Sequence, residues 1–285
     1  MKILVTGVNG QLGYDVIEQL RTSGYDEIEG IDINNLDITD KDEVDLFFSS
    51  RKFDVIIHCA AYTQVDNAEE DEQRCYQVNV LGTKFLVEQA KISGSKFIYI
   101  STDYVFDGKK EGQYDEHDIP NPLSVYGKTK YLGELEVLKI ERSFIVRISW
   151  VFGKNGKNFV KTVIRLSKEN QHLNIVNDQI GSPTYTKDLS RLLVDMMLTD
   201  KYGIYHVTNE GTCSWYEFAK EILRIINSEI PISPINSEQF KTKAIRPKNS
   251  SLSKNKLISN GFYPLPTWKD ALERYIKHEI NDQLK

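Results

Sequence analysis

Short apolar runs alternate with longer stretches of helical spacing through the first half of the chain. The apolar runs are residues 3–5, 27–33, 55–57, 97–100 and 144–148. The stretches of helical spacing are residues 12–20, 41–50, 71–92 and 124–138. Strands that alternate with helices of this length imply βαβ units and a parallel sheet that is buried on both faces. The alternation therefore predicts an α/β fold.

The regularity loosens after Trp150. A capping box formed by Ser214 and Glu217 opens an amphipathic helix in this part of the chain. Other segments with a recognisable pattern are helical at residues 158–167 and 187–197 and extended at residues 174–176 and 204–207.

This change of pattern indicates a division of the chain into two parts. We expect residues 1–152 to form the sheet-bearing domain, with segments of about 183–210 packing back on it. Residues 153–285 are expected to form mainly a second, smaller lobe.

The composition restricts the classes of partner. Of 285 residues, 36 are Lys or Arg and 41 are Asp or Glu, which gives a net charge of −5 with both signs spread along the chain. No basic block or stripe is present, so nucleic acid is not an expected partner. The hydrophobic content of 40% is sufficient for a sizeable core.

Cysteine usage and hydropathy indicate the compartment. Cys59, Cys75 and Cys213 are widely spaced and contain no CxxC pair, which argues against a disulfide framework and a zinc site and fits a reducing cytoplasm. The first residues, MKILVTG, reach a glycine too soon for a signal peptide. No apolar stretch approaches the ~18 residues that a membrane span needs. We therefore expect a cytoplasmic protein with no membrane partner.

A glycine-rich turn, TGVNGQLG, joins the first predicted strand to the first predicted helix. Its glycines are Gly7, Gly10 and Gly13. Glycines at such a junction allow a tight turn and the close approach of a pyrophosphate to the helix N-terminus. The spacing is G-x-x-G-x-x-G rather than the dinucleotide fingerprint G-x-G-x-x-G. The position of the turn nevertheless favours a dinucleotide site.

Asp32, at the end of the second predicted strand, supports this interpretation. It follows Gly13 by 19 positions, close to the ~20 expected of the acid that binds the adenosine ribose. An Asp at a strand end is often only a turn residue, but the combination favours a cofactor role. Its charge also repels a 2′-phosphate, and Ile33-Asn34-Asn35 offers no arginine to hold one. Of NADH and NADPH, the sequence therefore favours NADH.

A candidate catalytic set follows the fourth predicted strand. The stretch STDYVFDG places Thr102 at the strand end, and YGKTK then places Tyr126 and Lys130 four positions apart, on one face of a helix. A nearby ammonium is expected to lower the pKa of the tyrosine from its free value of ~10. Such a pair can donate a proton to a carbonyl oxygen that accepts a hydride.

The YxxxK pattern occurs a second time, at Tyr216 and Lys220. This copy lies on the capped helix beyond the alternating half, and no strand-end hydroxyl precedes it. We therefore expect it to be structural. Only the ordered set of glycine turn, acidic strand end, strand-end threonine and YxxxK is specific.

This ordered set resembles the extended short-chain dehydrogenase/reductase family, whose glycine spacing is the one found here. Within that family the chain is similar, nearly end to end, to reductases of dTDP-4-keto-6-deoxy sugars. The resemblance implies a Rossmann-type doubly wound parallel sheet with a smaller C-terminal substrate-binding lobe. The stretches that carry it are GVNGQLG, CAAYTQVDNAE, STDYVFDG, VYGKTK, RISWVFG, NDQIGSPT and RPKNSSLS.

The resemblance also implies roles for individual residues. The catalytic residues would be Thr102, Tyr126 and Lys130. The cofactor would be contacted by Tyr126 and Lys130 and by Gly7, Gly10, Gln11, Leu12, Gly13, Asp32, Asp37, Ile38, Ala60, Ala61, Tyr62 and Thr63. The substrate would be contacted by Thr102, Asp103, Trp150 and Arg246, with Arg246 as a phosphate partner because a guanidinium matches phosphate geometry.

The implied activity is the NAD(P)H-dependent reduction of the 4-keto group of dTDP-4-dehydro-L-rhamnose to dTDP-L-rhamnose, a precursor of cell-surface polysaccharide. The alternatives are another nucleotide-sugar epimerase or reductase of the same family and a non-catalytic regulatory subunit. A dehydratase would carry Asp-Glu after the threonine, whereas Thr102-Asp103 is followed here by Tyr104. Intact Tyr126 and Lys130 argue against a regulatory subunit.

No metal site is assigned from the sequence. Some relatives are homodimers that hold Mg²⁺ with acidic residues, so the resemblance makes a homodimer one expectation for this chain. Asp15 and Asp188 fall at roughly corresponding positions. Two carboxylates do not establish a metal site. Five dispersed histidines receive no metal or catalytic role, namely His58, His117, His172, His206 and His278. His58-Cys59 replaces the Asn-Ala common in relatives, which we interpret as a packing variation.

Overall fold

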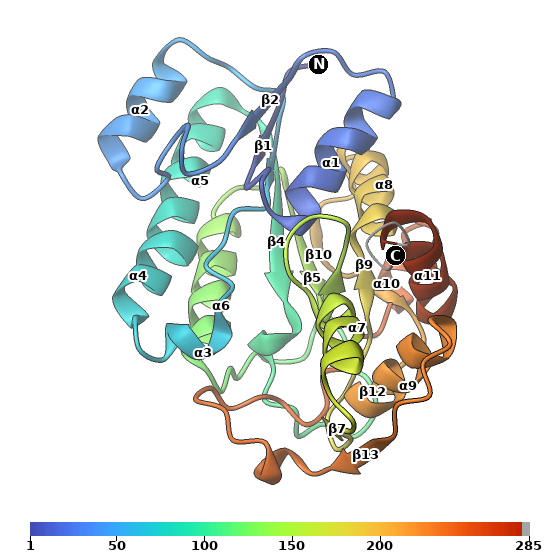
Figure 1. Ribbon diagram of the computed structural model, residues 1–285. Helices are drawn as coiled ribbons and strands as arrows, with labels where there is room; N and C mark the ends of the chain where they lie inside the picture. Colours follow the sequence, from blue (N-terminus) through green and yellow to red (C-terminus); the bar gives the residue numbers. More distant parts are fainter. Residues whose placement is uncertain (281–285) are drawn as a thin grey trace.

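Six parallel strands form the central sheet of the chain (Figure 1). The computed structural model describes residues 1–280. The strand order across the sheet is β10-β5-β4-β3-β1-β2. The bounds are β1 Ile3–Thr6, β2 Ile28–Ile31, β3 Val55–His58, β4 Lys96–Thr102, β5 Ser143–Ile148 and β10 Gly203–His206. The α/β prediction is confirmed.

The order of the strands determines where a ligand can bind. β1 pairs in parallel with β2 on one side and with β3 on the other, so that Ile3 lies opposite both Ile28 and Val55. The chain moves outward from β1 to β2 and then returns across β1 to β3. In open α/β sheets, ligands bind at the carboxyl ends of the strands beside such a reversal. The candidate site is therefore expected beyond Thr6 and His58.

Helices cover both faces of the sheet because alternate strand residues point to opposite sides. Ile3 and Val5 pack with helices α1 and α8, whereas Leu4 packs with α2, α5 and α6. Figure 1 shows α1 and α8 on one side and α2, α5 and α6 on the other. The bounds are α1 Gln11–Thr22, α2 Lys41–Ser49, α5 Thr83–Ser93, α6 Val125–Val137 and α8 Thr186–Met197.

The long helix expected over residues 71–92 is divided. α4 (Glu72–Tyr76) and α5 are joined by η1, a wider π-type turn over Gln77–Gly82. A Cβ on Gly82 would lie 2.8 Å from the side chain of Ile38, so the close approach of this turn to the loop after β2 requires glycine. Such π-type turns are frequent at functional sites.

The remaining elements form a second core beside the sheet. Buried apolar side chains of α7 (Phe159–Glu169), α9 (Trp215–Ile225) and α11 (Trp268–Tyr275) pack together. The capping box that opens α9 is present, because Ser214 and Glu217 each bond the other's backbone N–H at 3.0 and 2.8 Å. The shorter strands, all in two-stranded pairs, are β6 Val151–Phe152, β7 Leu173–Val176, β8 Ile180–Gly181, β9 Thr184–Tyr185, β11 Asn209–Glu210, β12 Cys213–Ser214, β13 Ile232–Ile235 and β14 Leu265–Thr267.

Short helical elements complete the described chain. They are α3 Val65–Ala68, η2 Asp103–Val105, η3 Ser237–Gln239, α10 Asn255–Ser259 and η4 Ile276–Ile280. None of the helices in residues 1–280 has the length and apolar character needed to cross a membrane. Although β10 and α8 follow residue 152 in the chain, they add a sixth strand beside β5 and a helix beside α1.

Candidate active site

A cavity of about 1060 Å³ opens at the carboxyl ends of β1, β3, β4 and β5. It brings together residues that are far apart in the sequence. Of the residues expected at the site, it is lined by Gly7, Gly10, Gln11, Leu12, Gly13, Asp32, Asp37, Ile38, Ala60, Ala61, Tyr62, Thr63, Thr102, Asp103, Tyr126, Lys130 and Trp150. Arg246 is not among the lining residues.

The glycine turn between β1 and α1 depends on two of its glycines. Gly7 has a φ of +70°, and a Cβ there would lie 2.7 Å from the backbone of Ala60. A Cβ on Gly13 would lie 2.2 Å from the carbonyl oxygen of Gly7. The turn can therefore be this tight only with glycine. It leaves the first backbone N–H groups of the twelve-residue helix α1 at the cavity, where they can bind an anion.

Asp32 follows β2 and holds the same turn. Its Oδ2 accepts the backbone N–H of Asn9 at 2.9 Å, and its Oδ1 accepts that of Ile33 at 2.8 Å. Each carboxylate oxygen has further lone pairs. Asp32 is therefore both the turn residue that its position suggested and a cavity-lining carboxylate.

Asp37 carries a charge beside the same end of the cavity. Partial burial raises its pKa, but hydrogen bonds from Thr39 and the charge of Arg74 outweigh burial and hold the pKa below the ordinary value. Arg74 donates to Thr39 Oγ1 at 3.2 Å and lies 3.7 Å from Asp37. It lines the cavity, and sequence analysis missed it because a lone arginine on a helix carries no local signal.

Asn79, in the π-type turn η1, fixes the loop after β3. Its Oδ1 accepts the backbone N–H of Tyr62 at 2.8 Å, and its Nδ2 donates to the carbonyl oxygen of the same residue at 3.2 Å. The side chain is 1% exposed. Asn79 was also missed by sequence analysis, although it determines where Ala61, Tyr62 and Thr63 lie.

Thr102 is the last residue of β4 and lies 4% exposed at the cavity. Its hydroxyl donates to Asp103 Oδ1 at 3.1 Å and accepts the backbone N–H of Tyr104 at 3.2 Å, which caps the short helix η2. Asp103 Oδ2 is buried without a hydrogen bond of ordinary geometry among the described residues. Burial raises the pKa of Asp103 to about 6, and the nearby Ser250 side chain acts on the carboxyl group in the opposite direction, by lowering its pKa.

Helix α6 carries Tyr126 and Lys130 to the same place. Ser124 caps the helix by accepting the backbone N–H of Gly127 at 3.1 Å. A Cβ on Gly127 would lie 2.2 Å from the carbonyl oxygen of Tyr104. Glycine therefore lets the first turn of α6 approach the end of β4 closely, which brings Tyr126 near enough to Thr102 for the Thr102 side chain to lower its pKa.

The ionisation of the Tyr126–Lys130 pair differs from the expectation. Burial raises the pKa of Tyr126 above its ordinary value, and only the Thr102 hydrogen bond opposes this. The predicted lowering by Lys130 is therefore wrong for this environment. Burial lowers the pKa of Lys130 to about 7, so its ammonium is only partly formed at neutral pH. Its Nζ lies over the Tyr99 ring, 4.0 Å from the centroid.

Trp150 follows β5 in a strained backbone conformation, with a φ of +48°. A Cβ on Gly181 would lie 2.6 Å from its indole, so glycine is required there. Trp215 of α9 stacks on the same indole with centroids 3.6 Å apart and an interplanar angle of 8°. Trp150 therefore presents only the rest of its surface to the cavity, and Trp215, which sequence analysis did not single out, holds it in place.

Arg246 lies beside the cavity rather than in its wall. It donates to the two oxygens of Asp66 at 3.2 and 2.6 Å. Asp66 belongs to α3 and directly follows the cavity-lining residues Gln64 and Val65. The hydrogen bonds from Arg246 lower the pKa of Asp66, so the carboxylate of this pair stays ionised at neutral pH.

The loop after β6 lies over the glycine turn. Asn155 donates to the carbonyl oxygen of Asn9 at 2.7 Å, and Asn158 donates to Gln11 Oε1 at 3.0 Å. Gly156 and Lys157 of this loop line the cavity. Lys157 is a second basic residue that sequence analysis missed, because the loop has no motif of its own.

Comparison with known proteins identifies the family. The family described as RmlD substrate binding domain matches residues 1–281. The chain belongs to this RmlD family. A dTDP-4-dehydrorhamnose reductase from Bacillus anthracis, solved in complex with NADP, is 44% identical with a TM-score of 0.94, over 97% of this chain and 99% of that one.

Two curated relatives agree in length as well as sequence. A dTDP-4-dehydrorhamnose reductase from Aggregatibacter actinomycetemcomitans is 42% identical over 95% of this chain and 97% of its own. The spore coat polysaccharide biosynthesis protein SpsK from Bacillus subtilis is 39% identical over 97% of each chain. The resemblance drawn from the motifs is thereby confirmed at the level of the family.

In this RmlD-family chain, the two carboxylates considered for a metal are engaged elsewhere. Asp15 accepts the hydroxyl of Thr186. Asp188 pairs with Arg274 through two hydrogen bonds of 2.8 and 2.7 Å and accepts Asn209 at 2.9 Å. Within residues 1–280, no cluster of three or more His, Cys, Asp or Glu side chains is arranged to hold a metal ion.

The second YxxxK copy and His58 lie outside the reacting end of the cavity. Tyr216 and Lys220 are on α9, and neither lines the cavity. His58 is buried, with its ring nitrogens 2.7 Å from Thr6 Oγ1 and 3.1 Å from Thr83 Oγ1. Burial lowers the pKa of His58 to about 3, so it is a neutral packing group.

Proposed function

We propose that this chain catalyses the NAD(P)H-dependent reduction of the 4-keto group of dTDP-4-dehydro-L-rhamnose to dTDP-L-rhamnose. One observation carries the proposal: a single cavity joins the glycine turn at one end to Thr102, Tyr126 and Lys130 at the other. The named reductases that match the chain over nearly its whole length support the choice of substrate.

The cofactor fits the residues that are present. The Gly7–Gly13 turn and the N-terminus of α1 would hold the pyrophosphate, Asp32 the adenosine ribose, and Lys130 the nicotinamide ribose. When bound, the dihydronicotinamide supplies a hydride from its C4 atom. Asp32 favours NADH, and the Bacillus anthracis relative that binds NADP is consistent with use of both cofactors.

The chain's own residues supply the proton and the electrostatics. Tyr126 would donate its phenolic proton to the C4 oxygen of the sugar as the carbonyl is reduced. The phenol is protonated at neutral pH, as a general acid must be. Burial raises its pKa and so makes it a weaker acid, and the hydrogen bond with Thr102 offsets part of that effect. Thr102 would stabilise the phenolate that forms by hydrogen bonding to it, and Lys130 would hold the nicotinamide ribose.

Asp103, Trp150 and Arg246 are proposed to bind the sugar nucleotide. Asp103 Oδ2 is a buried acceptor without a hydrogen bond of ordinary geometry among the described residues, so a sugar hydroxyl is a suitable donor for it. Trp150 offers an apolar edge to the sugar ring. Arg246 is held by Asp66, which adjoins the cavity-lining Val65, and at this rim its guanidinium would match a pyrophosphate.

The two parts of the chain divide these tasks in the proposal. Residues 1–152, with β10 and α8, form the NAD(P)-binding unit, and residues 153–285 form mainly the substrate-binding lobe. The sheet with its cavity at the β1–β3 reversal supports the first assignment. The position of Trp215 against Trp150 supports the second. The named biosynthetic reductases among the relatives support a cytoplasmic location for the proposed enzyme.

The alternatives make different demands on the site. A dehydratase needs a second carboxyl group after Asp103, and Tyr104 occupies that position with its pKa raised by burial. A phenol that does not ionise near neutral pH is a poor base for elimination. A regulatory subunit needs none of the catalytic groups, yet Thr102, Tyr126 and Lys130 all line the cavity.

The test is a coupled assay with the purified protein. dTDP-4-dehydro-L-rhamnose, generated in place by an epimerase, is mixed with NADH or NADPH, and the nicotinamide absorbance is followed. Oxidation of the cofactor together with dTDP-L-rhamnose in the product, identified by NMR, supports the proposal. An unchanged absorbance, with the epimerase shown to be active, would contradict it and favour a regulatory subunit.

A further inference from the structure

A buried ion pair lies directly behind the candidate catalytic residues. Arg147 of β5 donates to Glu134 of α6 through Nε at 2.8 Å and through Nη2 at 2.7 Å. The two side chains are 2% and 0% exposed. Burying two charges costs desolvation that their attraction only partly offsets, so such a pair is weak evidence for a role in stability alone.

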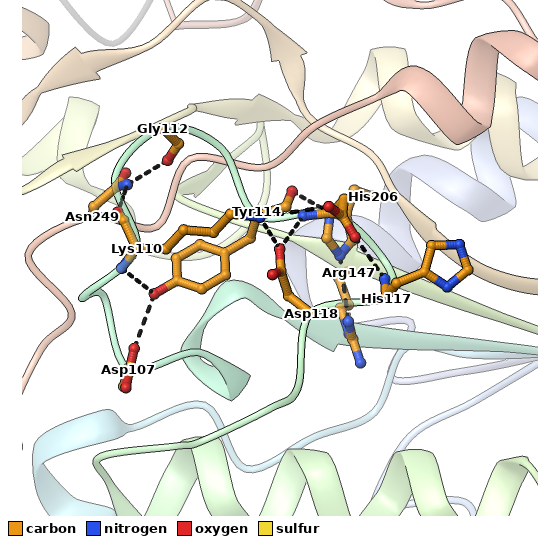
Figure 2. Close-up of polar contacts among 10 residues, drawn as sticks. Asp107, Lys110, Gly112, Tyr114, His117, Asp118, Arg147, His206 and Asn249 are labelled. Atoms are coloured by element: carbon orange, nitrogen blue, oxygen red, sulfur yellow. Dashed lines mark hydrogen bonds and ion pairs between the residues drawn. The ribbon is translucent and has the colours of Figure 1, made fainter.

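The pair is part of a network that links four elements. Ser101 of β4 donates to Glu134 Oε1 at 2.5 Å, and Arg147 Nη1 lies 3.4 Å from His206 Nε2 of β10. The other ring nitrogen of His206 lies 3.2 Å from the carbonyl oxygen of Tyr114. Figure 2 shows this side of the network, in which His206 lies between Arg147 and Tyr114. The guanidinium thus joins the catalytic helix to the sheet.

Both members of the pair adjoin residues of the candidate site, either along their own element or through a direct partner. Glu134 is one helical turn beyond Lys130 on the same face of α6. Its partner Ser101 directly precedes Thr102 on β4. Arg147 lies just before the cavity-lining residues that end β5. A displacement of the pair would therefore move Lys130 and Thr102 relative to each other.

We propose that Glu134 and Arg147 are positioning residues for the reduction, which set the distance between helix α6 and the end of β4. Their geometry suits this role, because two parallel charge-assisted hydrogen bonds constrain both distance and orientation. The helix approaches closely at the adjacent residue, where a Cβ on Gly133 would lie 2.3 Å from the hydroxyl of Tyr99. The inference rests on the proposed function.

The test separates positioning from stability by removing one charge and then both. E134Q leaves Arg147 buried without a counter-charge, whereas E134Q/R147M removes both charges and keeps an acceptor for Ser101. We expect E134Q to lower both the Tm and kcat. The double variant should recover most of the Tm, because replacing a whole buried pair is often neutral, while kcat stays roughly tenfold to a hundredfold low, because a shift of about 1 Å at a site is that costly.

D188N is the matched control. It removes the charge from another nearly buried carboxylate that binds an arginine through two hydrogen bonds, between α8 and α11 and away from the cavity. D188N should lower the Tm and leave kcat per folded molecule unchanged. R147K keeps the charge but not the paired hydrogen bonds, so it should lower kcat in the same way as E134Q. It replaces the Glu134 variants as the test if these do not fold.

The outcomes are distinguishable. Recovery of wild-type kcat in E134Q/R147M, or wild-type kcat per folded molecule in E134Q or R147K, would show that the pair is only structural. A wild-type protein without reductase activity would instead overturn the proposed function itself. Low kcat with a recovered Tm in the double variant, or low kcat in R147K beside an active D188N, supports the inference.

Discussion

Arg246 and Asp66 form an ion pair that joins two segments 180 positions apart, with the guanidinium 2.6 Å from Asp66 Oδ2. The pair ties residues 242–248 to α3 at the rim of the cavity. Lys243, in the same segment, pairs with Glu70, four residues after Asp66. Only the Arg246 pair adjoins the cavity wall, whereas the Lys243 pair is exposed at the surface, where an ion pair contributes little.

R246A is expected to raise KM for the nucleotide sugar and to leave the Kd of NADH unchanged. The loss of a hydrogen bond to a charged group costs roughly 1.5–3 kcal/mol, which is about tenfold to a hundredfold in affinity. Steady-state kinetics and cofactor titration measure the two quantities. K243A, with its ion pair on the same segment, is the control and should change neither. An unaltered sugar KM in R246A would remove Arg246 from the site.

Tyr126 and Tyr216 distinguish the two YxxxK copies. Y126F keeps the ring and its edge contact with Tyr104, whose centroid is 5.6 Å away, but deletes the proton donor. A general acid contributes about 10²–10⁴-fold, so kcat should fall by that factor while NADH still binds. Y216F should retain kcat, because Tyr216 lies on α9 outside the cavity. Thermal melting of both variants excludes unfolding, and an inactive Y216F would show that the wrong helix has been assigned.

Cofactor choice is expected to depend on the charge of Asp32. The wild type should use NADH at least as well as NADPH, because the carboxylate repels a 2′-phosphate. D32N removes the charge and keeps one of the two oxygens that accept backbone N–H groups, so it should raise kcat/KM for NADPH relative to NADH. Steady-state kinetics with each cofactor gives the ratio. A strong wild-type preference for NADPH, or a ratio unmoved by D32N, would count against this role.

Lys130 is expected to reduce stability while serving catalysis. Burial lowers its pKa from 10.5 to about 7 in the folded chain, so the unfolded chain binds more protons between those two values. The free energy of unfolding therefore rises as pH increases from about 7 to 10.5. Below about pH 7, the folded chain bears the whole desolvation cost of the buried ammonium. K130M has no such penalty and should melt at a higher temperature than the wild type, although it is inactive.

The pH dependence supplies the check on this prediction. The gain in Tm of K130M over the wild type should be largest at or below pH 7 and should shrink toward pH 10. Differential scanning calorimetry at several pH values measures it. K128M, on the same helix but exposed at its surface, should show no comparable gain. A K130M Tm below that of the wild type at neutral pH would mean that the lysine packs at no net cost.

Much of the site is readable from local pattern. The glycine turn, the acid after β2 and the Tyr126–Lys130 spacing are each contained in a few consecutive residues, and local sterics and helical periodicity determine what such residues form. The central strands follow in the same way from their apolar runs. Their ends are less well defined, because Ser101 and Thr102 have no apolar character and join β4 only through pairing with Arg147 and Ile148.

Other features depend on pairs that no local pattern connects. Trp215 covers Trp150, and Asn79 fixes Tyr62, only because the topology brings these segments together. The expected effect of Lys130 on Tyr126 was wrong for a related reason: spacing predicts that two groups are neighbours, whereas burial, which depends on the whole packed structure, dominates both pKa values.

The amino-acid sequence by itself determined the succession of strands and helices along the chain, the family and the residues proposed to carry the chemistry, because these depend on short-range spacing. Only the tertiary structure decided how those residues are held and ionised. The Glu134–Arg147 pair behind Lys130 and the Arg246–Asp66 pair at the rim join segments across the fold. Such contacts follow from strand order and desolvation, which are properties of the assembled chain rather than of any stretch of it.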